Sequence, residues 1–84
     1  MNENEFKKFY SGDKLDSLKM AIHIIKGEVK DGMDAVNQKY KKEVKDVISF
    51  LKNNYKPLEN IPGILLQGDS FELIKLLDHV YKRR

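Results

Sequence analysis

The sequence predicts a mainly α-helical fold, a small bundle of three or four helices. Apolar residues recur at three- and four-residue steps along residues 14–30, 34–54 and 70–82, and this spacing places them on one face of an α-helix. Glycine and proline fall between these stretches, where connections are expected. The chain has 84 residues, a length typical of one domain around one core. We therefore expect residues 1–84 to form a single helical domain.

Residues 1–12 carry three aromatic side chains but show no firm periodicity. Phe6, Phe9 and Tyr10 fit either a short helical turn or a flexible, extended arm, and their spacing suits a strap over the core. Asp13 then predicts the start of a helix, because an aspartate side chain accepts hydrogen bonds from the free amides of the first turn.

The first predicted helix covers residues 14–30. Gly27 lies inside it, at a cost of up to about 1 kcal/mol relative to alanine. Gly32 predicts its end, because glycine adopts the left-handed conformation that follows many helices. The apolar stripe of this helix consists of Leu15, Leu18, Ile22, Ile25 and Val29.

The second predicted helix covers residues 34–54, about 30 Å at 1.5 Å per residue. Its stripe is nearly in phase with that of the first helix, so one long bent helix is an alternative to two helices. We prefer a hairpin, because two separate helices can bury their apolar faces against each other. The second stripe consists of Val36, Tyr40, Val44, Val47 and Leu51.

The last third of the chain begins with a turn at Pro62 and Gly63. Residues 64–66 are a short apolar run that fits either a short β element or a buried connection. Asp69 and Glu72 have the spacing of a capping box, which predicts that the last helix starts near residue 70. Its expected inward residues are Leu73, Ile74, Leu77, Val80 and Tyr81.

The composition excludes several classes of function. With no cysteine, thiolate zinc sites and thiol catalysis are impossible, and a reducing compartment such as the cytoplasm is favoured. The N-terminal residues lack the apolar run of a signal peptide. Nothing approaches the ~20 apolar residues of a membrane span, so we expect no membrane partner.

No catalytic, cofactor-binding or metal-binding residues are predicted. His23 and His79 are the only histidines, and neither belongs to a pair with metal-ligand spacing. Ser70 lies at a predicted helix start and has no base placed by a motif, so capping explains it better than nucleophilic catalysis. The glycines match no phosphate-binding pattern. The sequence therefore indicates a protein that is not an enzyme.

The tyrosines are candidates for contact with a partner, because tyrosine is enriched at protein interfaces. Tyr40 and Tyr81 fall on apolar stripes and are expected in the core. Tyr10 and Tyr55 lie at or just beyond helix ends and are the better interface candidates, with a half-buried structural role as the alternative for each.

The second helix also predicts a basic face opposite its apolar stripe, formed by Lys41, Lys42, Lys45 and Lys52. This face fits a phosphate backbone, an acidic protein surface, or simply a solvated helix back. The net charge is +3, and 14 of the 16 basic residues are lysine, which suits phosphate contact better than base readout. Glu43 is spaced to pair with Lys39 on the same helix.

Residues 61–71 read IPGILLQGDSF. This segment resembles the FPGVVIQGDSL stretch of small bacterial proteins encoded near polymorphic toxins, a group that includes immunity proteins. The resemblance implies a protein that binds and neutralises a cognate toxin, with Gln67 and Asp69 as the positions to test. In that family a strand-rich segment precedes the motif, whereas a long helix is predicted here. A basic chain of this kind is expected to cover a neutral or acidic toxin surface.

These observations predict a small, non-enzymatic protein-binding module, in its sharpest form a bacterial immunity or antitoxin-like protein whose partner is a toxin. The alternative is a small nucleic-acid-binding regulator that uses the lysine face of the second helix.

Overall fold

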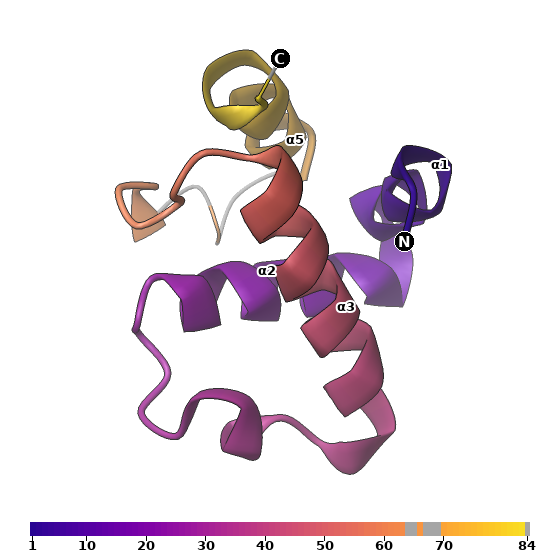
Figure 1. Ribbon diagram of the computed structural model, residues 1–84, viewed down its shortest axis with the longest axis vertical. Coiled ribbons are helices and arrows are strands. Elements are labelled where there is room, and N and C mark those ends of the chain that lie inside the picture. The colour runs from indigo at the N-terminus through magenta and orange to yellow at the C-terminus, as the bar shows by residue number, and fades with distance from the viewer. Residues whose placement is uncertain (64–65, 67–69, 84) are drawn as a thin grey trace.

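The protein is a small helical bundle in which nearly every ordered element is a helix, as predicted (Figure 1). The computed structural model describes residues 1–63, 66 and 70–83. In chain order the elements are α1 (Glu3–Phe6), η1 (Lys7–Tyr10), α2 (Gly12–Ile25), η2 (Gly32–Ala35), α3 (Gln38–Asn54), α5 (Ser70–Leu76) and η3 (Leu77–Tyr81). The elements η1 and η2 are 3-10 turns, and η3 is a π-helical turn.

The two long helices are separate, so the alternative of one long bent helix is wrong; they cross each other rather than forming a close hairpin (Figure 1). α2 ends at Ile25, five residues before the predicted end at residue 30. The backbone amide of Gly27 donates to the carbonyl of Ile24 at 3.0 Å, and the amide of Glu28 donates to that of His23 at 3.0 Å. Gly27 has a φ of 75°, the left-handed conformation that terminates helices in this way. Gly27 is therefore the helix stop, not a weak point inside the helix.

α3 begins at Gln38, later than the predicted start at residue 34. Asn37 has a ψ of 137°, outside the helical region, and its side chain accepts a hydrogen bond from the amide of Lys39 at 3.0 Å. This is the geometry of an N-cap. Val36 consequently belongs to the connection rather than to the helix, although its side chain is buried.

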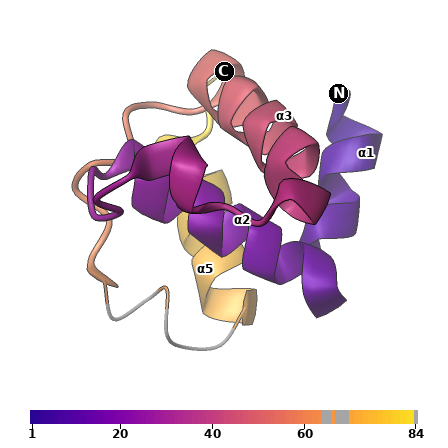
Figure 2. The same cartoon turned by 90° about the horizontal axis from the view of Figure 1, so that it is seen from below.

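The core lies where α2 crosses α3, with the N-terminal elements and α5 closing it (Figure 2). The fully buried side chains come from α1, α2, α3, the connection after α3 and the last helical segment, because a bundle this small has only one interior. The largest of them are Phe6, Leu18, Ile22, Leu51, Leu58, Ile61, Leu73, Leu77, Val44 and Val47.

Residues 3–10 are helical and packed on the bundle, so the helical turn rather than the extended arm is observed. The Phe6 side chain is completely buried. Its ring stacks on Phe50 with centroids 4.4 Å apart, and the ring of Tyr10 meets it edge to face with centroids 5.7 Å apart. Aromatic pairs in this range add stabilisation beyond the area that they bury.

The chain after α5 returns to the end of α3. An isolated antiparallel bridge joins Tyr55 to Lys82, and the amide of Lys56 donates to the carbonyl of Tyr81 at 2.7 Å. The ammonium of Lys82 also forms an ion pair with Glu3 of α1. These contacts join the last helical segment to the end of α3 and to α1.

The Tyr55 side chain is 2% exposed, so the structure places in the core a residue predicted for an interface. Its hydroxyl donates to Asp78 at 3.3 Å. Burial, together with the neighbouring Tyr10 and Asp78, holds the pKa of the Tyr55 hydroxyl well above its usual range. Tyr55 is therefore a structural residue that links α3 to the last helical segment.

The last third of the chain differs from expectation at Val80. This residue was expected to point inward, but it is 52% exposed. The physical reason is the π-helical turn, which holds more residues than an α-helical turn and so rotates Val80 away from the core. The β element predicted at residues 64–66 lies mostly outside the described residues, which include only Leu66, helical and buried.

Replacing Phe6 with alanine should lower the free energy of unfolding by about 3–5 kcal/mol. The loss is large because the cavity would open among four aromatic rings, and it approaches the whole stability of a small domain, ~5 kcal/mol. Chemical denaturation measures it. Lys7→Ala, at an exposed neighbouring position, should change stability by less than about 0.5 kcal/mol. Equal losses for the two variants would contradict the role of Phe6.

Stability should fall as the pH rises above about 10, the usual pKa of tyrosine. Above that pH the unfolded chain releases the Tyr55 proton while the folded chain retains it, so the pH rise favours unfolding. Tyr55→Phe should cost about 1 kcal/mol at pH 8 through the lost hydrogen bond. Denaturation at pH 8 and pH 11 should show that the difference in free energy of unfolding between the native protein and the variant is smaller at pH 11. An equal difference at the two pH values would contradict the assignment.

Candidate functional site: an open groove beside Tyr40

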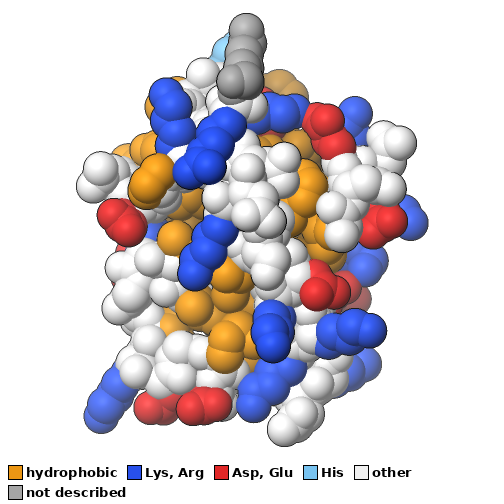
Figure 3. Space-filling model, viewed as in Figure 1, with side chains coloured by type: hydrophobic (Ala, Val, Ile, Leu, Met, Phe, Trp, Pro, Cys, Tyr) orange, Lys and Arg blue, Asp and Glu red, His pale blue; other side chains and the backbone are white. Residues whose placement is uncertain are grey.

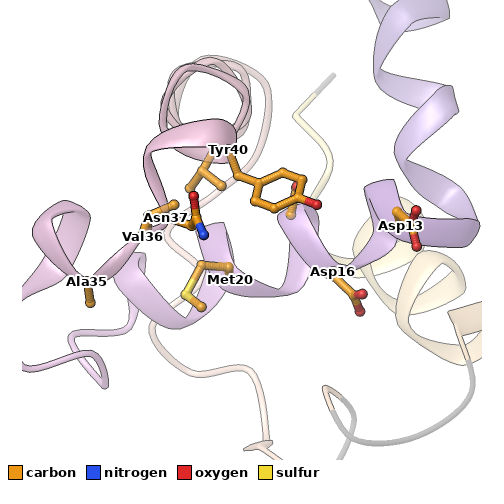
Figure 4. A pocket seen from close by; sticks show the side chains of 9 residues that line it. Asp13, Asp16, Met20, Ala35, Val36, Asn37 and Tyr40 are labelled. Atoms are coloured by element: carbon orange, nitrogen blue, oxygen red, sulfur yellow. The ribbon is translucent and has the colours of Figure 1, made fainter.

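An open groove of about 430 Å³ lies between α2 and the connection that leads into α3. A second hollow, of about 520 Å³, lies beside Lys42. Hydrophobic side chains reach the surface among lysines in this part of the molecule (Figure 3). Figure 4 shows the side chains that line the groove. They are Asp13, Asp16, Ser17, Met20, Ala35, Val36, Asn37, Tyr40 and Val44.

One wall of the groove is the ring of Tyr40. This residue was expected in the core, but it is 39% exposed. The reason is its position in the first turn of α3, before the helix reaches its crossing with α2. The ring extends over α2, with its hydroxyl directed toward the end that carries Asp13 and Asp16 (Figure 4). The ammonium of Lys39 lies 5.5 Å from the ring centroid, so this ring already interacts with a cation.

The rim of the groove is acidic. Asp13 and Asp16 are both exposed, and neither forms a salt bridge with any residue that the structure describes. Asp13 lies in the first turn of α2, where the helix dipole favours a negative charge. It is not the helix cap that the sequence predicted, because Ser11 occupies that position. The two carboxylates are therefore available to a partner.

A cluster of polar side chains beside the groove joins α2 to α3. Glu43 of α3 accepts hydrogen bonds from Lys14 and from Ser17, each at 2.7 Å. Ser17 is 5% exposed. The hydrogen bond from Lys14, and next that from Ser17, lower the pKa of Glu43. Glu43 was expected to pair with Lys39 on its own helix, but its ion pair crosses to α2.

The predicted lysine face is only partly realised. Lys42 and Lys45 are exposed, whereas Lys41 is half-buried. Carboxylates lie among these lysines, and a shallow hollow beside Lys42 is also lined by Glu43 and Asp46. The face is therefore a mixture of charges rather than an unbroken basic stripe.

The structure does not gather the predicted partner-binding residues into one site. Tyr10 is half-buried and packs against Phe6, and Tyr55 is in the core. Gln67 and Asp69 lie outside the described residues. Only the lysines of α3 remain on the surface, and of these none lines the groove.

The two histidines have structural or surface positions. His23 bonds Glu28 at 2.9 Å, which supports the turn after α2, and His79 is exposed. Within residues 1–63, 66 and 70–83, no group of three or more histidine, cysteine or acidic side chains could hold a metal ion. No helix in this part of the chain has both the length and the apolar character to cross a membrane.

Comparisons with known proteins add no family. The chain matches no family model, no curated protein and no solved structure.

The sequence analysis did not predict the groove, because the groove forms between α2 and the connection into α3. Local sequence patterns do not show how two such segments are placed relative to each other. One signal was present. Asp13, Asp16 and Met20 are spaced three and four residues apart, which places two acids and a thioether on one face of α2. Tyr40 fits an apolar stripe by spacing, and only the late start of α3 reveals its exposure.

Glu43→Gln should destabilise the protein by about 1 kcal/mol at pH 7, because it removes two charge-assisted hydrogen bonds. The lowered pKa of Glu43 means that its contribution is present above about pH 4.5 and lost as the pH falls through the folded-state value. Thermal unfolding from pH 7 to pH 3 should show the variant and the native protein converging. Asp46→Asn, an exposed change on the same helix, should have little effect at either pH.

Proposed function

We propose that this protein is a non-enzymatic, protein-binding module, and that its groove beside Tyr40 is the contact site. The observation that carries the proposal is the combination of an apolar floor, an exposed aromatic wall and two carboxylates without ion pairs in the described structure. Protein interfaces concentrate their binding energy in such places, where an anchor side chain enters a pocket.

The chemistry of the groove favours a lysine or arginine side chain of the partner. The aliphatic stem of such a residue would pack on Met20 and Val36, since long basic side chains bury their stems on apolar surface. Its charged head would lie between Asp16 and the Tyr40 ring, where both the carboxylate and the ring attract a cation. A neutral aliphatic side chain would contact the apolar floor but would make no charged interaction with Asp16 or the Tyr40 ring.

The narrower form of the proposal is a bacterial immunity or antitoxin-like protein that acts in the cytoplasm on a cognate toxin. Its support is the resemblance at residues 61–71 and the absence of cysteine from the sequence. In this form the toxin would present the basic side chain that enters the groove.

A second candidate function is nucleic-acid binding through the lysines of α3. The exposure of Lys42 and Lys45 favours it. Against it stand Glu43 and Asp46 among the same lysines, because carboxylates repel a phosphate backbone. The two candidates differ in their response to salt, since phosphate contacts weaken steeply as salt rises.

The test is affinity capture from the native lysate at about 0.5 M salt, with nuclease, where surface attraction between charges is largely screened. The bait is the tagged native protein or the groove variant Tyr40→Ala/Met20→Ala. We expect one stoichiometric protein on the native bait and at least about tenfold less on the variant, because each lost anchor costs more than about 1 kcal/mol. Asp13→Asn/Asp16→Asn should weaken capture chiefly at low salt.

The matched control for the acidic rim is Asp31→Asn/Asp34→Asn, two exposed carboxylates outside the groove. This control should capture as much protein as the native bait. Equal capture by the groove variant would refute the groove as the site. Nucleic acid recovered only at low salt, and lost when Lys42 and Lys45 become glutamine, would support the second candidate instead. A captured toxin would support the narrower form.

A further inference from the structure

The last helical segment carries an exposed face that is distinct from the groove. Phe71 is 70% exposed and Val80 is 52% exposed. They lie at the two ends of a shallow hollow of about 380 Å³. The residues of this face, here called the C-terminal face, are Phe71, Glu72, Lys75, Leu76, His79 and Val80.

The π-helical turn keeps this face straight. The residues of this face form three adjacent pairs, and each pair follows the previous one by four positions. In a regular α-helix, each step of four positions rotates the side chain by about 40° around the helix axis. The segment Leu77–Tyr81 is π-helical, closed by a 2.9 Å hydrogen bond from the amide of Lys82 to the carbonyl of Leu77. A wider turn shifts positions four apart in the opposite sense, so His79 and Val80 stay in line with Phe71.

Two copies of the C-terminal face are complementary when they run antiparallel to each other. When a second copy lies antiparallel, Phe71 of one chain meets Val80 of the other, and Glu72 meets His79. The central Lys75 meets Leu76, whose side chain its aliphatic stem can cover. Imidazole can donate a hydrogen bond to a carboxylate whether it is neutral or charged. A parallel arrangement would instead oppose Glu72 to Glu72 and Lys75 to Lys75.

We propose that the C-terminal face binds a second copy of this chain, as an antiparallel dimer about a twofold axis between residues 75 and 76. Such an interface is isologous, with the same patch used by both subunits. The charge pattern selects this occupant, because each charged residue meets a complementary or apolar one only in the antiparallel order.

The dimer should be weak. Ten residues of helix extend about 15 Å, which is too little to reach the ~800 Å² per partner of a standard interface. Interfaces below that size are typical of transient association. α5 and η2 lie at opposite ends of the molecule (Figure 1), so a dimer formed through α5 would leave the groove open.

The test is sedimentation velocity on the full chain, from about 10 µM to about 1 mM, the range that reports weak association. The native protein should shift from monomer to dimer across this range. His79→Glu opposes two carboxylates at both ends of the interface and should weaken the dimer about tenfold. The double variant Glu72→Lys/His79→Glu should recover dimerisation, because the lysine introduced at position 72 would meet the glutamate introduced at position 79 of the other copy.

Both positions are exposed, and circular dichroism should confirm that the variants fold. Asn60→Glu adds the same charge at an exposed site outside the face and should dimerise like the native protein. A native chain that stays monomeric at about 1 mM would overturn the proposal and leave the face to a different protein. Failure of the double variant to recover would overturn it as well, since parallel pairing keeps like charges opposed.

Discussion

The structure depends above all on the burial of the Phe6 ring. Phe6 lies in a one-turn helix that could not persist alone, because isolated helices this short are unstable in water. Stacking on Phe50 of α3 at 4.4 Å and contact with Tyr55 at 5.9 Å hold that turn in place. The ring therefore joins the start of the chain to the middle of the bundle. Without it, residues 1–10 would lose their most deeply buried anchor and α3 would expose an aromatic surface.

The helical nature of the fold could be predicted because the apolar residues recur locally at three- and four-residue steps. The stripes that include Leu18, Ile22, Val44 and Val47 are buried as their periodicity indicates. Helix ends were harder, because a glycine inside a periodic pattern has two meanings. At Gly27 the positive φ makes it a stop, and periodicity continues past it only because Val29 happens to stay in phase.

Exposure was the least predictable property. Tyr40 and Val80 both satisfy an apolar spacing, yet one precedes the helix crossing and the other lies in a change of helix type. The late start of α3 has a local signal in the Asn37 cap, whereas the change of helix type has none that periodicity could reveal. The candidate groove depends on Tyr40, and the C-terminal face depends on Val80. Functional surfaces escape pattern analysis here because they use apolar residues that spacing alone would assign to the core.

The ion pair between Glu3 and Lys82 joins residues separated by 79 positions. During synthesis at ~5–20 residues per second, about 4–16 s pass between these two residues. Until α3 and the last helix have been made, the aromatic side chains of the first turn remain without Phe50, Tyr55 or that helix to cover them. The nascent chain therefore exposes these aromatic side chains until late in its synthesis, and hydrophobic surface exposed in this way is prone to aggregate.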